Sequence, residues 1–221
     1  KSHPRHPRVI NGVVRISLYI SGLIFTCIKM WDGLTHYIVA IKYGTICSLL
    51  SCLWLRQPFF YANDTLFRMK MYYVIRNVAT AVIIFTYLFE IGWIHFDESG
   101  PSLVPCMIHL TVFEITYWIW HRMQHKNKWL YKYTHAMHHS VETPAPLDAY
   151  YLNFLDIVMV VLLLNFPFCL SPAMPKQSHI WLMTIVNCGS VMQHSARWLR
   201  AGHINHHAHP DEGRYTFLLG I

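Results

Sequence analysis

Long uninterrupted apolar runs constrain the fold of this sequence more than any other feature. Four of them, 13–30, 37–55, 73–94 and 103–120, have about the 20 residues that an α-helix needs to cross a hydrocarbon core roughly 30 Å thick. Only 13% of the residues are charged, which is about half the level of soluble domains. We therefore predict an all-α integral membrane helical bundle and exclude a soluble or disordered chain.

Two further apolar stretches follow these four. Residues 152–170 are equally apolar and predict a fifth span, whereas the shorter stretch 178–193 fits either a tilted sixth span or a re-entrant leg. The turn between them is marked by Pro167, Pro172 and Pro175. Because no repeat or soluble segment interrupts this pattern, residues 1–221 are predicted to form one membrane-embedded domain.

Basic residues between the apolar runs predict the orientation of the bundle, because cytoplasmic loops retain an excess of lysine and arginine. With the N-terminus in the cytosol, most of the 18 lysines and arginines fall on that side. The turn 95–102 carries Asp97 and Glu98 but no lysine or arginine, as expected of a lumenal loop. The segment 121–151 and the tail from His194 then share the cytosolic face. This orientation, rather than nucleic-acid binding, explains the net charge of +7.

Histidine is enriched, with 16 residues against 11 acidic ones. The clusters are an H-x-x-x-H at 121–125 and two H-x-x-H-H motifs at 135–139 and 203–207, with His194 before the last. On a helix, positions i, i+3 and i+4 project from one face, so each cluster can present several imidazoles to one point. We predict nine metal ligands: His121, His125, His135, His138, His139, His194, His203, His206 and His207.

Nine imidazoles exceed the needs of one ion, since a zinc ion is saturated by about four ligands. The set therefore predicts two metal ions, and neutral imidazole suits iron, zinc and copper. A lone H-x-x-x-H is common by chance. Three clusters and His194 on one membrane face favour a metal centre over that explanation.

Acidic and aromatic residues near the boxes are candidates to orient the ligands, because a metal-bound histidine normally gives its second N–H to a carboxylate or carbonyl. Glu114 lies two helical turns before His121, and Tyr117 lies one turn before it. We predict supporting roles for Glu114, Tyr117 and Asp148. Three further acids, Asp156, Asp211 and Glu212, fit either an orienting role or a solvated one.

The other histidines have simpler interpretations. His36, His95 and His179 lie near span boundaries, where polar tips reach the interface, and His109 lies within a span, where a partner is expected. His209 fits a ligand or a solvated residue. We expect His3 and His6 in a mobile basic end that leads into no signal-peptide cleavage site, and trimming at both ends of the chain.

The six cysteines fall within apolar stretches without C-x-x-C spacing, which predicts buried thiols rather than disulfides or a cysteine zinc site.

The ligand types constrain the chemistry. Soluble di-iron bundles use glutamates that are missing here, and no G-x-S-x-G supplies a nucleophile for hydrolysis. Iron with open coordination positions activates dioxygen for attack on C–H bonds, and the apolar bundle would hold a lipid. A membrane metal transporter is the alternative from another class; it would place ionisable residues along several spans. A zinc-dependent membrane hydrolase is a further alternative.

The three boxes following membrane hairpins resemble the fatty acid hydroxylase/sterol desaturase superfamily of membrane di-iron enzymes. The first spacing differs from the H-x-x-x-x-H of acyl-CoA desaturases. The aromatic lead 117–121 and the run 130–139 continue the resemblance, which covers residues 114–220. Pro144, Pro146 and Asp156, together with the tail 203–215, are similar to the sterol C-5 desaturase (lathosterol oxidase) branch.

Two departures from that branch leave the product open. Asn153-Phe154 stands where the branch commonly has a histidine before proline, and Gly202 replaces a histidine before the third box. The nine ligands are retained, but the lipid substrate, and the choice between alkene and alcohol, stay undecided.

The resemblance implies an endoplasmic reticulum oxidase with two iron ions facing the cytosol. It further implies O2 as oxidant and electrons from NAD(P)H through cytochrome b5 or a similar carrier. A C-5 type sterol desaturase is favoured, and a fatty acyl, sphingolipid or other lipid hydroxylase is the alternative.

Overall fold

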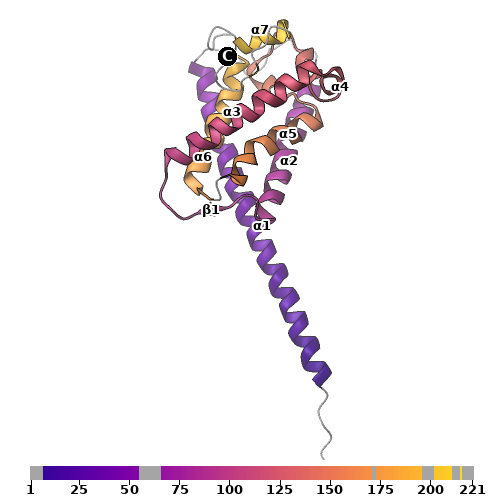
Figure 1. The fold of residues 1–221 in the computed structure, drawn as a ribbon, viewed down its shortest axis with the longest axis vertical. Coiled ribbons are helices and arrows are strands. Elements are labelled where there is room, and N and C mark those ends of the chain that lie inside the picture. The colour runs from indigo at the N-terminus through magenta and orange to yellow at the C-terminus, as the bar shows by residue number, and fades with distance from the viewer. Residues whose placement is uncertain (1–6, 55–65, 171–172, 196–201, 211–214, 216–221) are drawn as a thin grey trace, which may run out of the picture.

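The computed structural model describes the backbone of residues 7–54, 66–170, 173–195, 202–210 and 215, and side chains from residue 31 onward. In these ranges the chain is helical apart from short connections, so the prediction of an all-α membrane bundle with a histidine-rich cluster is confirmed. The bundle (Figure 1) is formed by α1 (Pro7–Trp54), α2 (Phe67–Glu90), α3 (Leu103–Lys126), α5 (Phe154–Asn165) and α6 (Lys176–Gln193).

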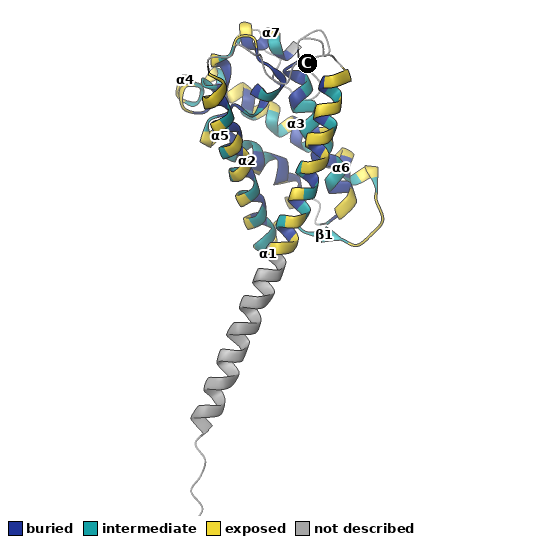
Figure 2. Cartoon of the chain, turned by 180° about the vertical axis from the view of Figure 1, so that it is seen from behind, coloured by how far each residue is buried: buried dark blue, intermediate teal, exposed yellow. Residues whose placement is uncertain are grey.

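The outer surface of the bundle is apolar, as a lipid-facing surface requires. Within the described residues, three helical segments are long and apolar enough to cross a membrane: Trp31–Trp54, Phe67–Glu90 and Leu103–Lys126. Large apolar side chains such as Ile75, which is 64% exposed, point outward along them, and Figure 2 shows exposed residues along the outer face of α1. Soluble monomers rarely expose so continuous an apolar surface.

The predicted separate spans 13–30 and 37–55 are wrong, because α1 is one continuous helix of 48 residues. The connecting residues 31–36 contain a single glycine and no proline, and one glycine costs a helix only about 1 kcal/mol relative to alanine. Gly33 also has a packing role: a Cβ there would lie 2.6 Å from Cδ1 of Phe89, so the glycine permits close approach of α1 and α2. Only the basic segments after α1 therefore indicate the orientation of the bundle.

Helix α2 begins and ends earlier than the predicted span 73–94. Its first turns include Arg68 and Lys70. Their charges lower the local hydropathy, so a hydropathy pattern places the start of the helix too late. It ends in a Schellman motif: Gly92 has a φ of 75°, its N–H donates to the Phe89 carbonyl, and the N–H of Trp93 donates to Leu88. Helix α3 begins at Leu103 as predicted and continues beyond residue 120.

The apolar helical segment at the predicted fifth span, 152–170, is shorter in the structure. Helix α5 has 12 residues and continues only as a 3₁₀ segment, η4 (Phe166–Cys169), which begins beside Pro167. Pro167 has no N–H to donate to the carbonyl four residues earlier, and its ring clashes with that carbonyl, so α5 cannot continue unchanged. Together the two are shorter than a span. Helix α6 has 18 residues but does not reach the hydropathy of a span. Helix α5 packs against α2 and α3, and α6 packs against α1 and α3.

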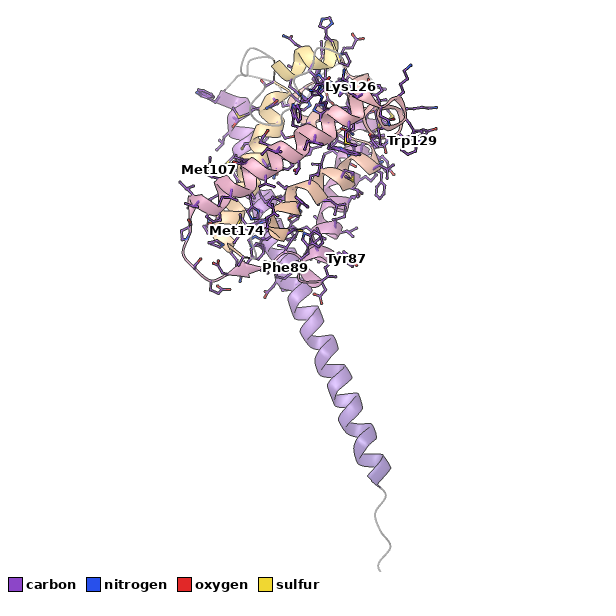
Figure 3. All side chains as sticks on the ribbon, in the orientation of Figure 1. Tyr87, Phe89, Met107, Lys126, Trp129 and Met174 are labelled. Carbon is purple, nitrogen blue, oxygen red and sulfur yellow. The ribbon has the colours of Figure 1, made fainter. Side chains whose placement is uncertain are left out.

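The two ends of the bundle differ in character. At one end, β1 (Phe96–Asp97) pairs in parallel with β2 (Met174–Pro175), joining the start of α6 to the turn after α2. At the other end lie the C-terminus of α3, the short α4 (Lys128–Leu130) and α7 (Gly202–Ala208) (Figure 1). Figure 3 shows residues at both ends: Lys126 lies near α7, whereas Phe89 and Met174 lie near β1. An apolar core that includes Phe85, Phe113 and Leu182 connects the two ends.

Candidate metal centre

The nine histidines predicted as ligands come together at the α7 end of the bundle in two adjacent groups. Within each group the possible ligand atoms all lie within 4.8 Å of one another. Group 1 is His121, His125, His135, His139 and His206, and group 2 is His138, His194, His203 and His207. Eight of the nine are buried, and His125 is half-buried.

Local geometry explains how one motif supplies both groups. Residues four apart share a helix face, and the pairs 121/125 and 203/207 each point into one group. In each H-x-x-H-H motif the first and last histidines belong to one group. The middle histidine, His138 or His206, belongs to the other group. In the second box, the chain passes through a π-helical turn, η1 (Tyr131–His135), into a 3₁₀ turn, η2 (His138–Ser140). Such π segments are frequently found at functional sites.

Backbone carbonyls fix the ring orientation of three histidines. The Nδ1 of His121 lies 3.1 Å from the carbonyl of Tyr215, that of His194 2.8 Å from Ser190, and that of His207 3.0 Å from Val141. A carbonyl only accepts, so each Nδ1 carries the proton. Each Nε2 of a neutral ring then presents its lone pair to the site.

A carboxylate orients a fourth histidine. His135 donates through Nδ1 to Oδ2 of Asp156 at 2.9 Å. The other carboxylate oxygen accepts from Nε2 of Gln124 at 2.9 Å and from the indole of Trp120 at 3.3 Å. Gln124 also donates to the hydroxyl of Thr134 at 2.9 Å. Asp156 therefore has partners on both oxygens and holds His135 with its Nε2 directed away from the carboxylate.

The arrangement of the Nε2 atoms fits metal ions. In group 1 the Nε2 atoms of His121, His125 and His206 lie 3.1 to 3.2 Å from one another, and in group 2 those of His138 and His194 are 3.2 Å apart. Lone pairs this close repel unless a cation or proton lies between them. The buried Nε2 atoms of His135, His139 and His207 have no partner in the described part of the chain, and buried polar atoms in proteins rarely lack one.

Burial keeps these imidazoles neutral, which is the form that binds metals. Burial and the neighbouring histidines lower the pKa of His206 to about 3 and that of His207 to about 2. Burial lowers the pKa of His194 to about 4, although its bond to the Ser190 carbonyl acts in the opposite direction. At neutral pH these three rings therefore carry lone pairs and not positive charges.

The predicted supporting residues have different positions. Tyr117 packs against the ring of His121, with ring centroids 5.5 Å apart, and Glu114 is buried on α3. Asp148, however, forms an ion pair with Lys70 at 3.0 Å and accepts from the N–H of Ala145. In the described part of the chain it forms no hydrogen bond or ion pair with a histidine, because η3 (Pro146–Tyr150) directs it toward α2.

The carboxylate that does contact a ligand is Asp156, for which the sequence left two roles open. A signal was available: Asp156 lies in the first turn of the very apolar α5, where an acid is costly unless it has a partner.

The remaining histidines that the structure describes lie outside both groups. His36 and His179 hydrogen-bond to each other at 3.0 Å, and His179 is buried, so the expectation that its tip reaches the interface is wrong. His109 is fully buried against Phe168, and its ring nitrogens have no partner among the described residues. His209 is exposed. Four candidates, His3, His6, Asp211 and Glu212, lie outside the described residues.

A cavity of about 290 Å³ lies beneath the histidines and is lined by residues of α1, α2, α3, η3, α5 and α6. Its deep part is lined by apolar side chains including Ala81, Val161 and Leu164. Its upper end is formed by His138, His194 and His203, all members of group 2. An apolar chamber that ends at possible metal ligands can hold a lipid against a metal centre.

The fold and the site define a class: a membrane helical bundle with two adjacent histidine clusters at one end and an apolar chamber below them. Residues 106–221 match the fatty acid hydroxylase family model. The chain belongs to the fatty acid hydroxylase family, and the predicted superfamily is confirmed. No solved structure matches the chain.

Curated relatives carry cholesterol 25-hydroxylase-like names. Cholesterol 25-hydroxylase-like protein 1, member 2 of Danio rerio is 38% identical over 67 residues, 28% of this chain and 24% of its own length. The Caenorhabditis elegans cholesterol 25-hydroxylase-like protein is 30% identical over 81 residues, which are 33% of this chain and 27% of that protein. Cholesterol 25-hydroxylase-like protein 2 of Danio rerio is 30% identical over 102 residues, which are 42% of this chain and 37% of that protein. The matched parts thus cover between 24% and 37% of these relatives.

Proposed function

We propose that this chain is a membrane-bound, O2-dependent di-iron lipid oxidase, acting as a hydroxylase or a desaturase. The observation that carries the proposal is the cavity whose apolar walls end at His138, His194 and His203. Membership of an iron-dependent oxidase family and the cholesterol hydroxylase-like names of its relatives support this function.

The two histidine groups would each hold one iron ion. Iron with open coordination positions supplies the activation of O2 that attack on an unactivated C–H bond requires. The chain contributes rings of fixed orientation, because Tyr215, Ser190, Val141 and Asp156 hold the Nδ1 protons of four histidines away from the centre. The apolar walls exclude water from the substrate and hold its hydrocarbon portion.

The overall reaction needs an electron donor. In hydroxylation one oxygen atom enters the C–H bond and the other leaves as water, with two electrons and two protons supplied from outside. In desaturation both oxygen atoms leave as water, with two hydrogens taken from the substrate and two electrons and two protons supplied from outside. We propose NAD(P)H as the electron source through cytochrome b5 or a similar carrier. Basic residues near the histidine end, Arg122, Lys126, Lys128 and Lys132, suit an acidic donor.

The same basic residues favour a cytosolic orientation of the histidine boxes, and endoplasmic reticulum membranes are the proposed location. We also propose that residues 1–221 act as one membrane-embedded domain.

A sterol is the favoured substrate. The cholesterol 25-hydroxylase-like relatives point to sterol hydroxylation, whereas Pro144, Pro146 and Asp156 are similar to the C-5 desaturase branch. A fatty acyl or sphingolipid hydroxylase is the alternative substrate assignment.

Expression of the longest natural form of the chain in cells that lack their own sterol C-5 desaturase tests the proposal, with lipids profiled by mass spectrometry. Restored 5,6-unsaturated sterol would support the desaturase, and a new hydroxylated lipid would support the hydroxylase. The control is the His138→Ala variant, which should form neither product. If cells that express the wild-type chain form no new oxidised lipid, although the purified chain holds two irons, the proposed function is contradicted.

A further inference from the structure

One face of α6 forms a wall of the cavity from its deep end to the histidines. The lining residues Met183, Val186, Asn187, Ser190, Gln193 and His194 follow helical spacing. Met183 and Val186 are apolar, whereas the next four are polar. The polarity of the cavity wall therefore increases toward the candidate metal centre.

Most polar side chains on the cavity wall already have protein partners. The hydroxyl of Tyr150 donates to Oδ1 of Asn187 at 2.8 Å, and Nδ2 of Asn187 donates to the Met183 carbonyl at 2.7 Å. The amide of Asn77 donates to the carbonyls of Tyr150 and Leu152. These groups stabilise the wall and are not free to bind a ligand.

Gln193 differs from them. Its side chain is buried, with 7% exposure, and its Nε2 has no hydrogen-bond partner in the described part of the chain. Among the described cavity-lining residues, only Gln193, His138 and His203 have a buried side-chain nitrogen without a partner. The two histidines belong to group 2. A buried amide that gains no hydrogen bond is costly. The Gln193 side chain lines the cavity, and a rotation of its amide would bring the Nε2 donor, which is almost fully covered in the structure, to an oxygen of the occupant.

Gln193 is next to the candidate centre in the chain. It directly precedes His194, so their Cα atoms are about 3.8 Å apart, and Nε2 of His194 lies 3.2 Å from Nε2 of His138. We propose that Gln193 is a positioning residue whose Nε2 donates to an oxygen of the lipid, so that the oxidised carbon lies only a few carbons from that oxygen. This inference rests on the proposed lipid oxidation.

The position of Gln193 selects among substrates. A lipid whose hydroxyl or carbonyl lies near the oxidised carbon would satisfy the amide. A sterol would then bind with its 3-hydroxyl near group 2 and be oxidised on nearby ring carbons such as carbon 5. Its side chain would occupy the apolar deep end by Val161 and Leu164. Oxidation at carbon 25, at the other end of the sterol, would leave the amide without a partner.

A binding measurement tests the hydrogen bond separately from turnover. Metal-loaded protein in nanodiscs, kept free of O2, is titrated with the matched probes 5α-cholestan-3β-ol and 5α-cholestane, and with octadecan-1-ol and octadecane. We expect each alcohol to bind about tenfold more tightly than its alkane, the effect of one hydrogen bond in a buried site. Gln193→Met keeps the length and removes the donor, so it should abolish most of this preference.

The control is Ile185→Met, on the same helix but outside the cavity lining, which should retain the preference. Equal binding of alcohol and alkane by the wild-type protein would overturn the inference, as would a full preference in Gln193→Met with two metals bound. If Gln193→Met fails to fold, the wild-type preference and the position of the new oxygen or double bond in the wild-type product still decide. Oxidation remote from the existing oxygen overturns the role of Gln193 but leaves the proposed function intact. Absence of any lipid oxidation by the iron-loaded wild type overturns the function instead.

Discussion

The Nδ1 of His135 lies 2.9 Å from Oδ2 of Asp156, and the two side chains are only 2% and 3% exposed. This contact joins the second histidine box to the first turn of α5, and one face of that helix, with Asp156, Ile157, Val160, Val161 and Leu164, lines the cavity. A single carboxylate thus connects a candidate metal ligand to a wall of the substrate chamber.

We expect Asp156→Asn to weaken metal binding by about 10–100-fold, the usual effect of losing a carboxylate that orients a metal-bound histidine. The amide cannot satisfy both sides, because Oδ1 also accepts from Gln124 and Trp120. Asparagine replaces one of the two carboxylate oxygens with an NH2 group, and this NH2 group would face another hydrogen-bond donor. Metal content per chain, measured by mass spectrometry after dialysis against buffered metal, checks the expectation.

Asp148→Asn is the matched control. It removes a buried carboxylate paired with Lys70 rather than with a histidine, so it should lower the thermal unfolding midpoint and leave both metals bound. Equal metal loss in the two variants would show that Asp156 has no special relation to the centre.

Asp148 and Asp156 illustrate how far the sequence leads at the site. The spacing of the boxes predicted which histidines come together, because i, i+4 geometry is local, and the structure gathers all nine; their binding of metal remains a prediction. Which carboxylate contacts them depends on how α5 and η3 pack against α2 and α3. That is tertiary information, and a sequence pattern does not contain it.

The fold shows the same division. Apolar length predicted the membrane bundle, but it treated residues 31–36 as a turn and 152–170 as a span. The close contact of Gly33 with Phe89 favours a continuous α1, while Pro167 shortens α5. Both outcomes depend on packing or on local backbone geometry that average hydropathy does not measure.

The division of the histidines into two groups predicts separable metal losses. We expect His125→Ala, in group 1, and His207→Ala, in group 2, each to reduce the content from about two ions to about one. His209→Ala is the control, since His209 is exposed and outside both groups. Wild-type metal content in either group variant would contradict the assignment of that histidine.

Removal of the metals should loosen α7 first. This helix has seven residues, and three of its side chains, His203, His206 and His207, belong to the two groups. A helix this short is not stable on its own, so ligation would be its main attachment. After chelation, hydrogen exchange should accelerate in α7 and in residues 131–140 while α1 and α2 stay protected. Unchanged exchange in α7 would show that metals do not hold it.

Gly44 should be intolerant of larger residues, because it lies where α1 and α6 are in close contact. A Cβ at this position would already lie 3.0 Å from Cβ of Asn187, whose Oδ1 holds the hydroxyl of Tyr150 in the cavity wall. Gly44→Val must therefore push α6 away or displace Asn187, and overpacking of this kind costs about 1–3 kcal/mol. We expect a lower unfolding midpoint and weaker lipid binding with both metals retained, because α1 supplies none of the nine histidines.

Gly100→Val, where a Cβ meets nothing within 4 Å, should leave all three measurements unchanged. A wild-type midpoint for Gly44→Val would show that the α1 and α6 contact is looser than the structure indicates.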